Sequence, residues 1–218
     1  MSKIPVYLMP GLAASSTIFE KIDLPNDIFE VYLLDWVLPF ENETLKSYAY
    51  RMAQKVNHKN PVLIGVSFGG ILVQEMAQFL EPKKIIIISS VKCNAELPLK
   101  MKFAKVSKIY KLLPTSLLSD MNQLEKYLLG SIPHQRIEYY KKYMTVTDKK
   151  YLDWAIEQVV GWDRKLPDNQ VIHIHGDRDT VFPSHNINNF IHVKGGTHVM
   201  ILNRSKWFNE NLAKIILG

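Results

Sequence analysis

The sequence has a single cysteine, Cys93, among its 218 residues. No internal disulfide can form, and nothing in the composition requires an oxidising compartment. No apolar run approaches the roughly 18 residues that a membrane span needs. The apolar start of the chain is interrupted by Pro5, Pro10 and Gly11, which favours a buried strand and its turn over a secretion signal. These absences predict a cytoplasmic protein without stable membrane insertion.

Signatures of bound groups are missing as well. The sequence has no glycine-rich phosphate loop, no zinc-type cysteine spacing and no internal repeat, so we expect no metal and no cofactor. The net charge of +6 comes from residues 92–167, which hold 14 Lys and Arg against 8 Asp and Glu. Such a segment could attract an anionic acyl group, a phosphopantetheine thioester or an anionic membrane, but a solvated polar face is the simpler interpretation. No nucleic-acid-binding motif accompanies it.

Short apolar runs alternate with helical patterns over most of the chain. Strands are predicted at 4–10, 29–36, 61–67, 84–90, 170–177 and 189–196, and helices at 44–58, 68–80 and 204–217. Several of the strands are nearly continuous in Val, Ile and Leu, which is typical of strands covered on both faces. The alternation predicts an α/β fold with a doubly wound, mostly parallel six-stranded sheet.

The interval between the fourth and fifth predicted strands does not follow this alternation. It contains only helical patterns, and the first of them gathers apolar residues on one face: Leu99, Phe103, Val106, Tyr110 and Leu113. We therefore predict a core made of residues 1–91 and 168–218, with an all-helical insertion at 92–167 that lies on the sheet.

The stretch GVSFG places Ser67 where a predicted strand ends and a predicted helix begins. Ligands of open parallel sheets bind beyond the carboxyl ends of the strands. A sharp strand-to-helix turn would expose the Ser67 hydroxyl there, at the cost of a strained backbone. It would also bring strand and helix so close that positions 65 and 69 need glycine, which both have. The pattern therefore predicts a nucleophilic serine in place of an ordinary turn residue.

A serine nucleophile needs a base and a residue that orients the base. His198 follows the last predicted strand in GGTHVM, at the edge of the sheet where Ser67 is expected, and His175 at another strand end is the alternative. For the acid, Asp179 in HGDRD lies far enough beyond the strand to turn back toward a histidine. Asp177 is closer to the strand end and could simply cap the turn.

With GVSFG, HGDRD and GGTHVM, and with MPGLAASSTIF after the first strand, the chain resembles the α/β-hydrolase superfamily. The resemblance implies that Ser67 is the nucleophile, His198 the base and Asp179 its partner. It implies that the backbone N–H groups of Leu12 and Phe68 form the oxyanion hole.

The resemblance also implies that the helical insertion is a cap over the site. Residues of this cap that are candidates to line the substrate pocket are Met101, Phe103, Tyr110, Trp154 and Trp162. The expected activity is hydrolysis of a small or medium-chain carboxylic ester. A thioesterase or acyltransferase with the same residues, and a ligand-binding sensor on the same scaffold, remain open alternatives.

Overall fold

The computed structural model describes residues 2–107 and 140–218, and within them six strands form one parallel sheet. The order across the sheet is β2-β1-β3-β4-β5-β6. The strands are β1 (Ile4–Met9), β2 (Phe29–Leu33), β3 (Val62–Val66), β4 (Lys84–Ile88), β5 (Val171–Gly176) and β6 (Ile191–Val193). All six lie within the predicted ranges, and the predicted fold class is confirmed. The last strand is shorter than predicted because only three of its residues pair with β5.

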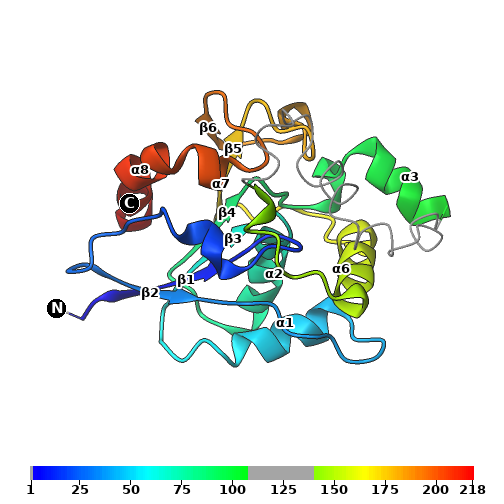
Figure 1. Ribbon diagram of the computed structural model, residues 1–218, viewed down its shortest axis with the longest axis horizontal. Coiled ribbons are helices and arrows are strands. Elements are labelled where there is room, and N and C mark those ends of the chain that lie inside the picture. Colours follow the sequence, from blue (N-terminus) through cyan, green and yellow to red (C-terminus); the bar gives the residue numbers. More distant parts are fainter. Residues whose placement is uncertain (1, 108–139) are drawn as a thin grey trace.

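Helices cover both faces of this sheet (Figure 1). Helices α1 (Leu45–Ala53) and α2 (Phe68–Met76) pack against each other beneath one face. Helix α2 continues into a short 3-10 helix, Ala77–Phe79, so that together they account for the predicted helix at 68–80. The short helix α7 (Met200–Asn203) and the C-terminal helix α8 (Ser205–Leu217) lie on the other side. The sheet is thus the middle layer of three, as alternating strands and helices require.

The two central strands lie in the core almost completely. Every residue of β3 is buried, and so are Ile85–Ile88 of β4. Strands enclosed by helices on both faces have no polar side to show to water, which explains their nearly unbroken apolar sequences. The rigid centre of the sheet therefore lies directly below the turns that follow β3 and β4.

The described part of 92–167 consists of helices and loops and contains no strand. It includes a 3-10 helix (Asn94–Glu96), α3 (Leu99–Ser107) and α6 (Lys149–Gly161), and the two α-helices lie together at one end of the molecule (Figure 1). Helix α6 buries Tyr151, Leu152, Trp154 and Ala155 against the core. The division of the chain into a core and a separate cap stays a prediction.

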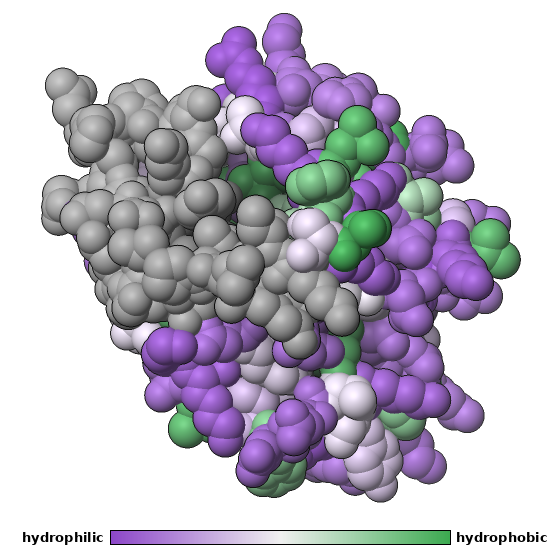
Figure 2. Space-filling view, turned by 90° about the vertical axis from the view of Figure 1, so that its right-hand side faces the viewer, coloured by the Kyte–Doolittle hydropathy of each residue, from purple (hydrophilic) through white to green (hydrophobic). Residues whose placement is uncertain are grey.

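Helix α3 departs from the expected packing. Its predicted inner face is exposed, with Leu99 at 80%, Phe103 at 68% and Val106 at 84% of their full accessibility. The view onto this side of the molecule shows green apolar residues scattered among purple hydrophilic ones (Figure 2). The other two members of the face, Tyr110 and Leu113, lie outside the described residues. Within the described ranges, no helix combines the length and apolarity that crossing a membrane requires.

Candidate active site

Ser67 stands at a sharp turn between β3 and α2, with φ at 52° and ψ at −120°. This is a backbone conformation that residues with a side chain rarely adopt, and it costs on the order of 1–3 kcal/mol. Two contacts hold it: the Ser67 N–H donates to Ile88 O (2.9 Å), and the Ser90 hydroxyl donates to Ser67 O (2.7 Å). The turn after β3 is therefore braced by the end of β4.

The glycines on either side of Ser67 are required by close backbone contacts. A Cβ on Gly65 would lie 2.2 Å from Gly69 O, and a Cβ on Gly69 would lie 2.3 Å from Pro10 O. Neither neighbour is a flexible side-chain end that could move aside. The strand, the helix and the loop after β1 therefore approach one another more closely than any other residue type would permit.

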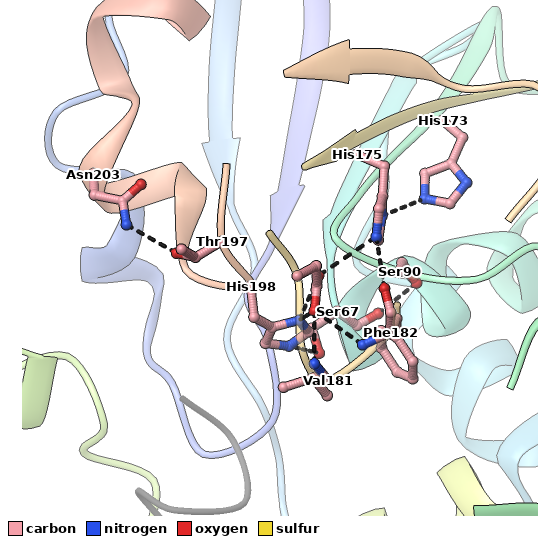
Figure 3. Close-up of polar contacts among 10 residues, drawn as sticks. Ser67, Ser90, His173, His175, Val181, Phe182, Thr197, His198 and Asn203 are labelled. Atoms are coloured by element: carbon pink, nitrogen blue, oxygen red, sulfur yellow. Dashed lines mark hydrogen bonds and ion pairs between the residues drawn. The ribbon is translucent and has the colours of Figure 1, made fainter. Parts of the chain in front are cut away.

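Ser67, His198 and Asp179 lie in hydrogen-bonding contact although they are far apart in the sequence (Figure 3). His198 Nε2 is 2.9 Å from Ser67 Oγ, and His198 Nδ1 is 2.9 Å from Asp179 Oδ2. They follow the carboxyl ends of β3, β6 and β5, which share one edge of the parallel sheet. An ionised carboxylate can only accept, so Nδ1 carries the proton and Nε2 is free to accept from the serine hydroxyl.

Asp179 is buried, yet its environment favours the charged form. Burial by itself raises the pKa of the carboxyl group, but the nearby His198 imidazole and the hydrogen bonds made to the carboxylate outweigh burial and hold the pKa below its usual range. Among these bonds, Oδ1 accepts from the N–H groups of Val181 and Phe182, each at 2.9 Å. The carboxylate therefore stays ionised at neutral pH and fixes the orientation of His198.

The two alternative residues from the sequence occupy other places. Asp177 accepts from the N–H of Gly195 (2.7 Å) and lies 3.3 Å from His192 Nε2, in an exposed turn. His175 is fully buried, and its two ring nitrogens are directed at Phe182 O and His173. Of the four candidates, His198 is the one that hydrogen-bonds to Ser67, and its other ring nitrogen hydrogen-bonds to Asp179.

Leu12 and Phe68, the predicted oxyanion donors, flank Ser67. Phe68 opens α2, so its N–H is one of the helix-start donors that have no partner within the helix. Leu12 follows Gly11, which adjoins Ser67: a Cβ on Gly11 would lie in ordinary van der Waals contact with the serine Cβ, at 3.4 Å. Trp36 contacts Phe68 and the residue before Leu12. Its indole N–H donates to Gly11 O (2.9 Å), and its ring stacks on Phe68 with centroids 5.0 Å apart.

A cavity of about 60 Å³ opens beside Ser67 and is almost entirely apolar. Its lining comprises Gly11, Leu12, Ala14, Ile18, Val66, Ser67, Tyr140, Tyr143, Met144, His198, Val199, Ile201 and Leu202. The segment that contributes Tyr143 is tied to the loop after β1, because Ser15 N donates to Tyr143 O (3.1 Å) and Val146 N to Ala13 O (3.0 Å). The wall of the cavity and the loop that carries Leu12 thus form one hydrogen-bonded unit.

The residues predicted to line the pocket lie elsewhere. The Trp154 indole donates to Glu43 O (2.7 Å) and that of Trp162 to Glu75 Oε1 (3.1 Å), so both rings fasten the insertion to the core. Met101 is half-buried and packs against the core, whereas Phe103 faces solvent. None of these four lines the cavity beside Ser67, and Tyr110 lies outside the described residues.

Sequence reasoning also missed several residues around the site. Ser90 and Trp36 follow β4 and β2, so the same strand-end argument that selected Ser67 could have found them. Tyr140 and Tyr143 carry no such signal, because partners that hold them are distant in the sequence: the Tyr143 hydroxyl donates to Glu20, 123 positions away, and Asn203 Nδ2 donates to the Tyr140 hydroxyl, 63 positions away. In the part of the chain that the structure describes, no three His, Cys, Asp or Glu side chains gather in a way that could hold a metal ion.

The order of the parallel sheet and the sharp serine turn after β3 define the α/β-hydrolase fold, and solved structures agree. The chain is similar to a hydrolase from Oleispira antarctica (TM-score 0.74, 14% identity, covering 100% of this chain and 92% of that one). It is also similar to a thermophilic esterase from Thermogutta terrifontis (0.71, 14%, 99% and 90%) and to an enol-lactonase from Burkholderia xenovorans LB400 (0.71, 12%, 100% and 93%). No protein-family model and no curated protein matches the sequence. The protein has the α/β-hydrolase fold.

Proposed function

We propose that this protein is a serine hydrolase that cleaves a carboxylic ester with a short apolar acyl group. The observation that carries the proposal is the unbroken contact from Ser67 Oγ to His198 Nε2, at 2.9 Å, and from His198 Nδ1 to Asp179 Oδ2, at 2.9 Å. A serine hydroxyl is a poor nucleophile until a base removes its proton, and this arrangement supplies the base and fixes its tautomer.

In the proposed reaction, Ser67 Oγ attacks the ester carbonyl while His198 Nε2 accepts the hydroxyl proton. The N–H groups of Leu12 and Phe68 donate to the oxyanion that forms, and Asp179 stabilises the imidazolium. His198 then protonates the leaving alcohol, and an acyl group remains on Ser67. A water molecule, deprotonated by His198, attacks the acyl carbonyl and releases the acid and free serine.

The cavity supports a short, uncharged acyl group. None of the described residues that line it is an Asp, Glu, Lys or Arg. On the same volume measure one water needs about 10–15 Å³, so about 60 Å³ has room for only a handful of non-hydrogen atoms. Each methylene buried there contributes about 0.8 kcal/mol to binding until the cavity is full. These properties favour acyl groups of two to four carbons over the anionic acyl groups that the basic segment suggested.

Covalent labelling by a fluorophosphonate probe tests the nucleophile. We expect the wild-type protein to be labelled, and the Ser67→Ala protein to lose labelling together with at least about 10⁴-fold in kcat. Ser107→Ala is the matched control, because Ser107 is exposed at the end of α3 and its labelling should equal that of the wild type. Labelling of Ser67→Ala at the wild-type rate would show that Ser67 is not the nucleophile.

A panel of matched esters and thioesters tests the substrate class. We expect kcat/KM to be greatest for acetyl to butyryl esters and to fall at least tenfold for octanoyl, because the longer chain does not fit the cavity. A tenfold preference for the sulfur analogues would identify a thioesterase, and acyl transfer to an added alcohol or amine an acyltransferase. Ligand binding without turnover of any of these compounds would identify a sensor.

A further inference from the structure

Two buried histidines lie behind the acid and take no part in the proposed reaction. His173 and His175 occupy alternate positions of β5, so their side chains leave the same face of the strand. Their exposed fractions are 1% and 0%. His173 Nε2 is 3.1 Å from His175 Nδ1, and His175 Nε2 is 2.8 Å from Phe182 O (Figure 3). The same Nε2 is 3.6 Å from Asp179 Oδ2.

These contacts determine where the protons are. A carbonyl oxygen can only accept, so the bond to Phe182 O requires a hydrogen on His175 Nε2. Burial is the largest cause that lowers the pKa of His175; the carboxylate of Asp179 acts in the opposite direction but does not prevail, and His198 adds to the lowering. His175 is therefore neutral at physiological pH, and its Nδ1 must be an acceptor.

The acceptor on His175 in turn assigns the proton of His173. The 3.1 Å contact is a hydrogen bond only if His173 Nε2 donates it. His173 is also held neutral: burial lowers its pKa most, the neighbouring His175 and Lys92 lower it further, and the Ser90 backbone acts in the opposite direction but does not prevail. His173 Nε2–H thus donates to His175 Nδ1, and His175 Nε2–H donates to the Phe182 carbonyl.

We propose that His173 and His175 are positioning residues for Asp179, and that His173 acts by fixing the tautomer of His175. In this tautomer His175 Nε2–H donates to Phe182 O, and its partly positive hydrogen lies near the carboxylate of Asp179. The segment it holds is the one whose Val181 and Phe182 N–H groups bind Asp179 Oδ1. In the other tautomer, a nitrogen lone pair would face both oxygens, and repulsion would displace the Asp179–Phe182 segment. The inference rests on the proposed role of Asp179.

His173 provides a sharp test because it acts on Asp179 only through His175. Glutamine places an N–H near the position of the histidine Nε2, asparagine near that of Nδ1, and phenylalanine supplies none. We expect His173→Phe and His173→Asn to lower kcat about 10–100-fold, as a displacement of about 1 Å at a catalytic group does. KM should change little because the cavity lies elsewhere. His173→Gln should retain at least a third of the wild-type kcat.

The pH profile separates positioning from a general loss of structure. If the Asp179 segment shifts, His198 loses part of its carboxylate contact, and the acidic limb of kcat/KM should move to lower pH in His173→Phe but not in His173→Gln. Thermal unfolding confirms that each variant is folded. Equal kcat values and equal pH profiles for the Phe and Gln variants would overturn the proposal.

Nitrogen-15 NMR of the wild-type protein reads the tautomers directly and needs neither turnover nor a folded variant. We expect His175 and His173 both to carry hydrogen on Nε2 at pH 7. A hydrogen on Nδ1 of either ring would overturn the inference. The expected tautomers in a protein that turns over no ester or thioester would instead overturn the proposed function, so the two failures are distinguishable.

Discussion

Helices α2 and α3 have the same length, nine residues each, yet they relate to the core in opposite ways. Every residue of α2 is buried, between β3 and α1, whereas no residue of α3 is. Two lysines of α3 bind backbone oxygens of the protein: Lys102 Nζ donates to Ala95 O (2.6 Å) and Lys105 Nζ to Gly161 O (2.9 Å). The apolar residues Leu99, Phe103 and Val106 are exposed, whereas Met101 packs against the core. Helical spacing alone thus predicts a helix, but the side on which it packs depends on the partners available.

The largest effect is expected from one added methyl group in α2. Gly69→Ala forces its Cβ against Pro10 O, at 2.3 Å from rigid backbone, so we expect the protein to lose at least about 4 kcal/mol of stability or fail to fold. Gly161→Ala in α6 is the matched control, because nothing lies within 4 Å of its Cβ. Urea unfolding of both variants measures the difference, and a Gly69→Ala protein of wild-type stability would show that the turn at Ser67 is loosely packed.

One identical substitution in each helix sharpens the comparison. Leu72→Ala in α2 removes a fully buried side chain and should lower the free energy of unfolding by about 2–5 kcal/mol. Leu99→Ala in α3 removes a side chain that is 80% exposed, and should change it by no more than about 0.5 kcal/mol. If Leu99→Ala also cost more than about 2 kcal/mol, the outer face of α3 would have a partner in solution.

The smallest effect concerns pH and contrasts a buried histidine with an exposed one. Burial lowers the pKa of His173 below its ordinary value of 6.5, so in the unfolded chain it binds a proton that the folded protein excludes. Stability should therefore be unaffected above about pH 6.5 and decrease as the pH falls below that value. His173→Phe should reduce this decrease, as measured by thermal unfolding at pH 7.5 and 5.5.

The control for the pH effect is His185→Phe, because His185 is exposed in the short 3-10 helix (Ser184–Asn186) that follows β5. The stability of the His185→Phe protein should depend on pH in the same way as that of the wild type. Equal slopes for the His173 and His185 variants would mean that the buried imidazole takes up a proton as readily in the folded protein as in the unfolded chain.

The sequence predicted the features that local chemistry determines. The strand β3, the turn at Ser67 and helix α2 follow from an apolar run, two glycines and a helical pattern within some twenty residues. The positions of Asp179 and His198 follow because strand ends of a parallel sheet share an edge.

The cavity wall could not be predicted in this way. Tyr140, Tyr143 and Met144 have no periodic pattern, and their place is set by backbone bonds to the loop around Ala13 and Ser15. The residue type of Trp154 predicts a side chain in the pocket, but its indole N–H donates to the backbone carbonyl of Glu43. The position of such a side chain depends on partners that are distant in the sequence, and a single sequence does not show which residues these partners are.

The φ angle of 52° at Ser67 has a consequence for laboratory evolution. Glycine adopts this torsion without the penalty that serine incurs, so Ser67→Gly should melt at a temperature no lower than the wild type despite losing the contact with His198. A library screened only for heat resistance would accordingly tolerate or enrich glycine at this codon, and each such survivor would lack the proposed nucleophile. Screens for robust forms of this protein need turnover as a second criterion from the first round.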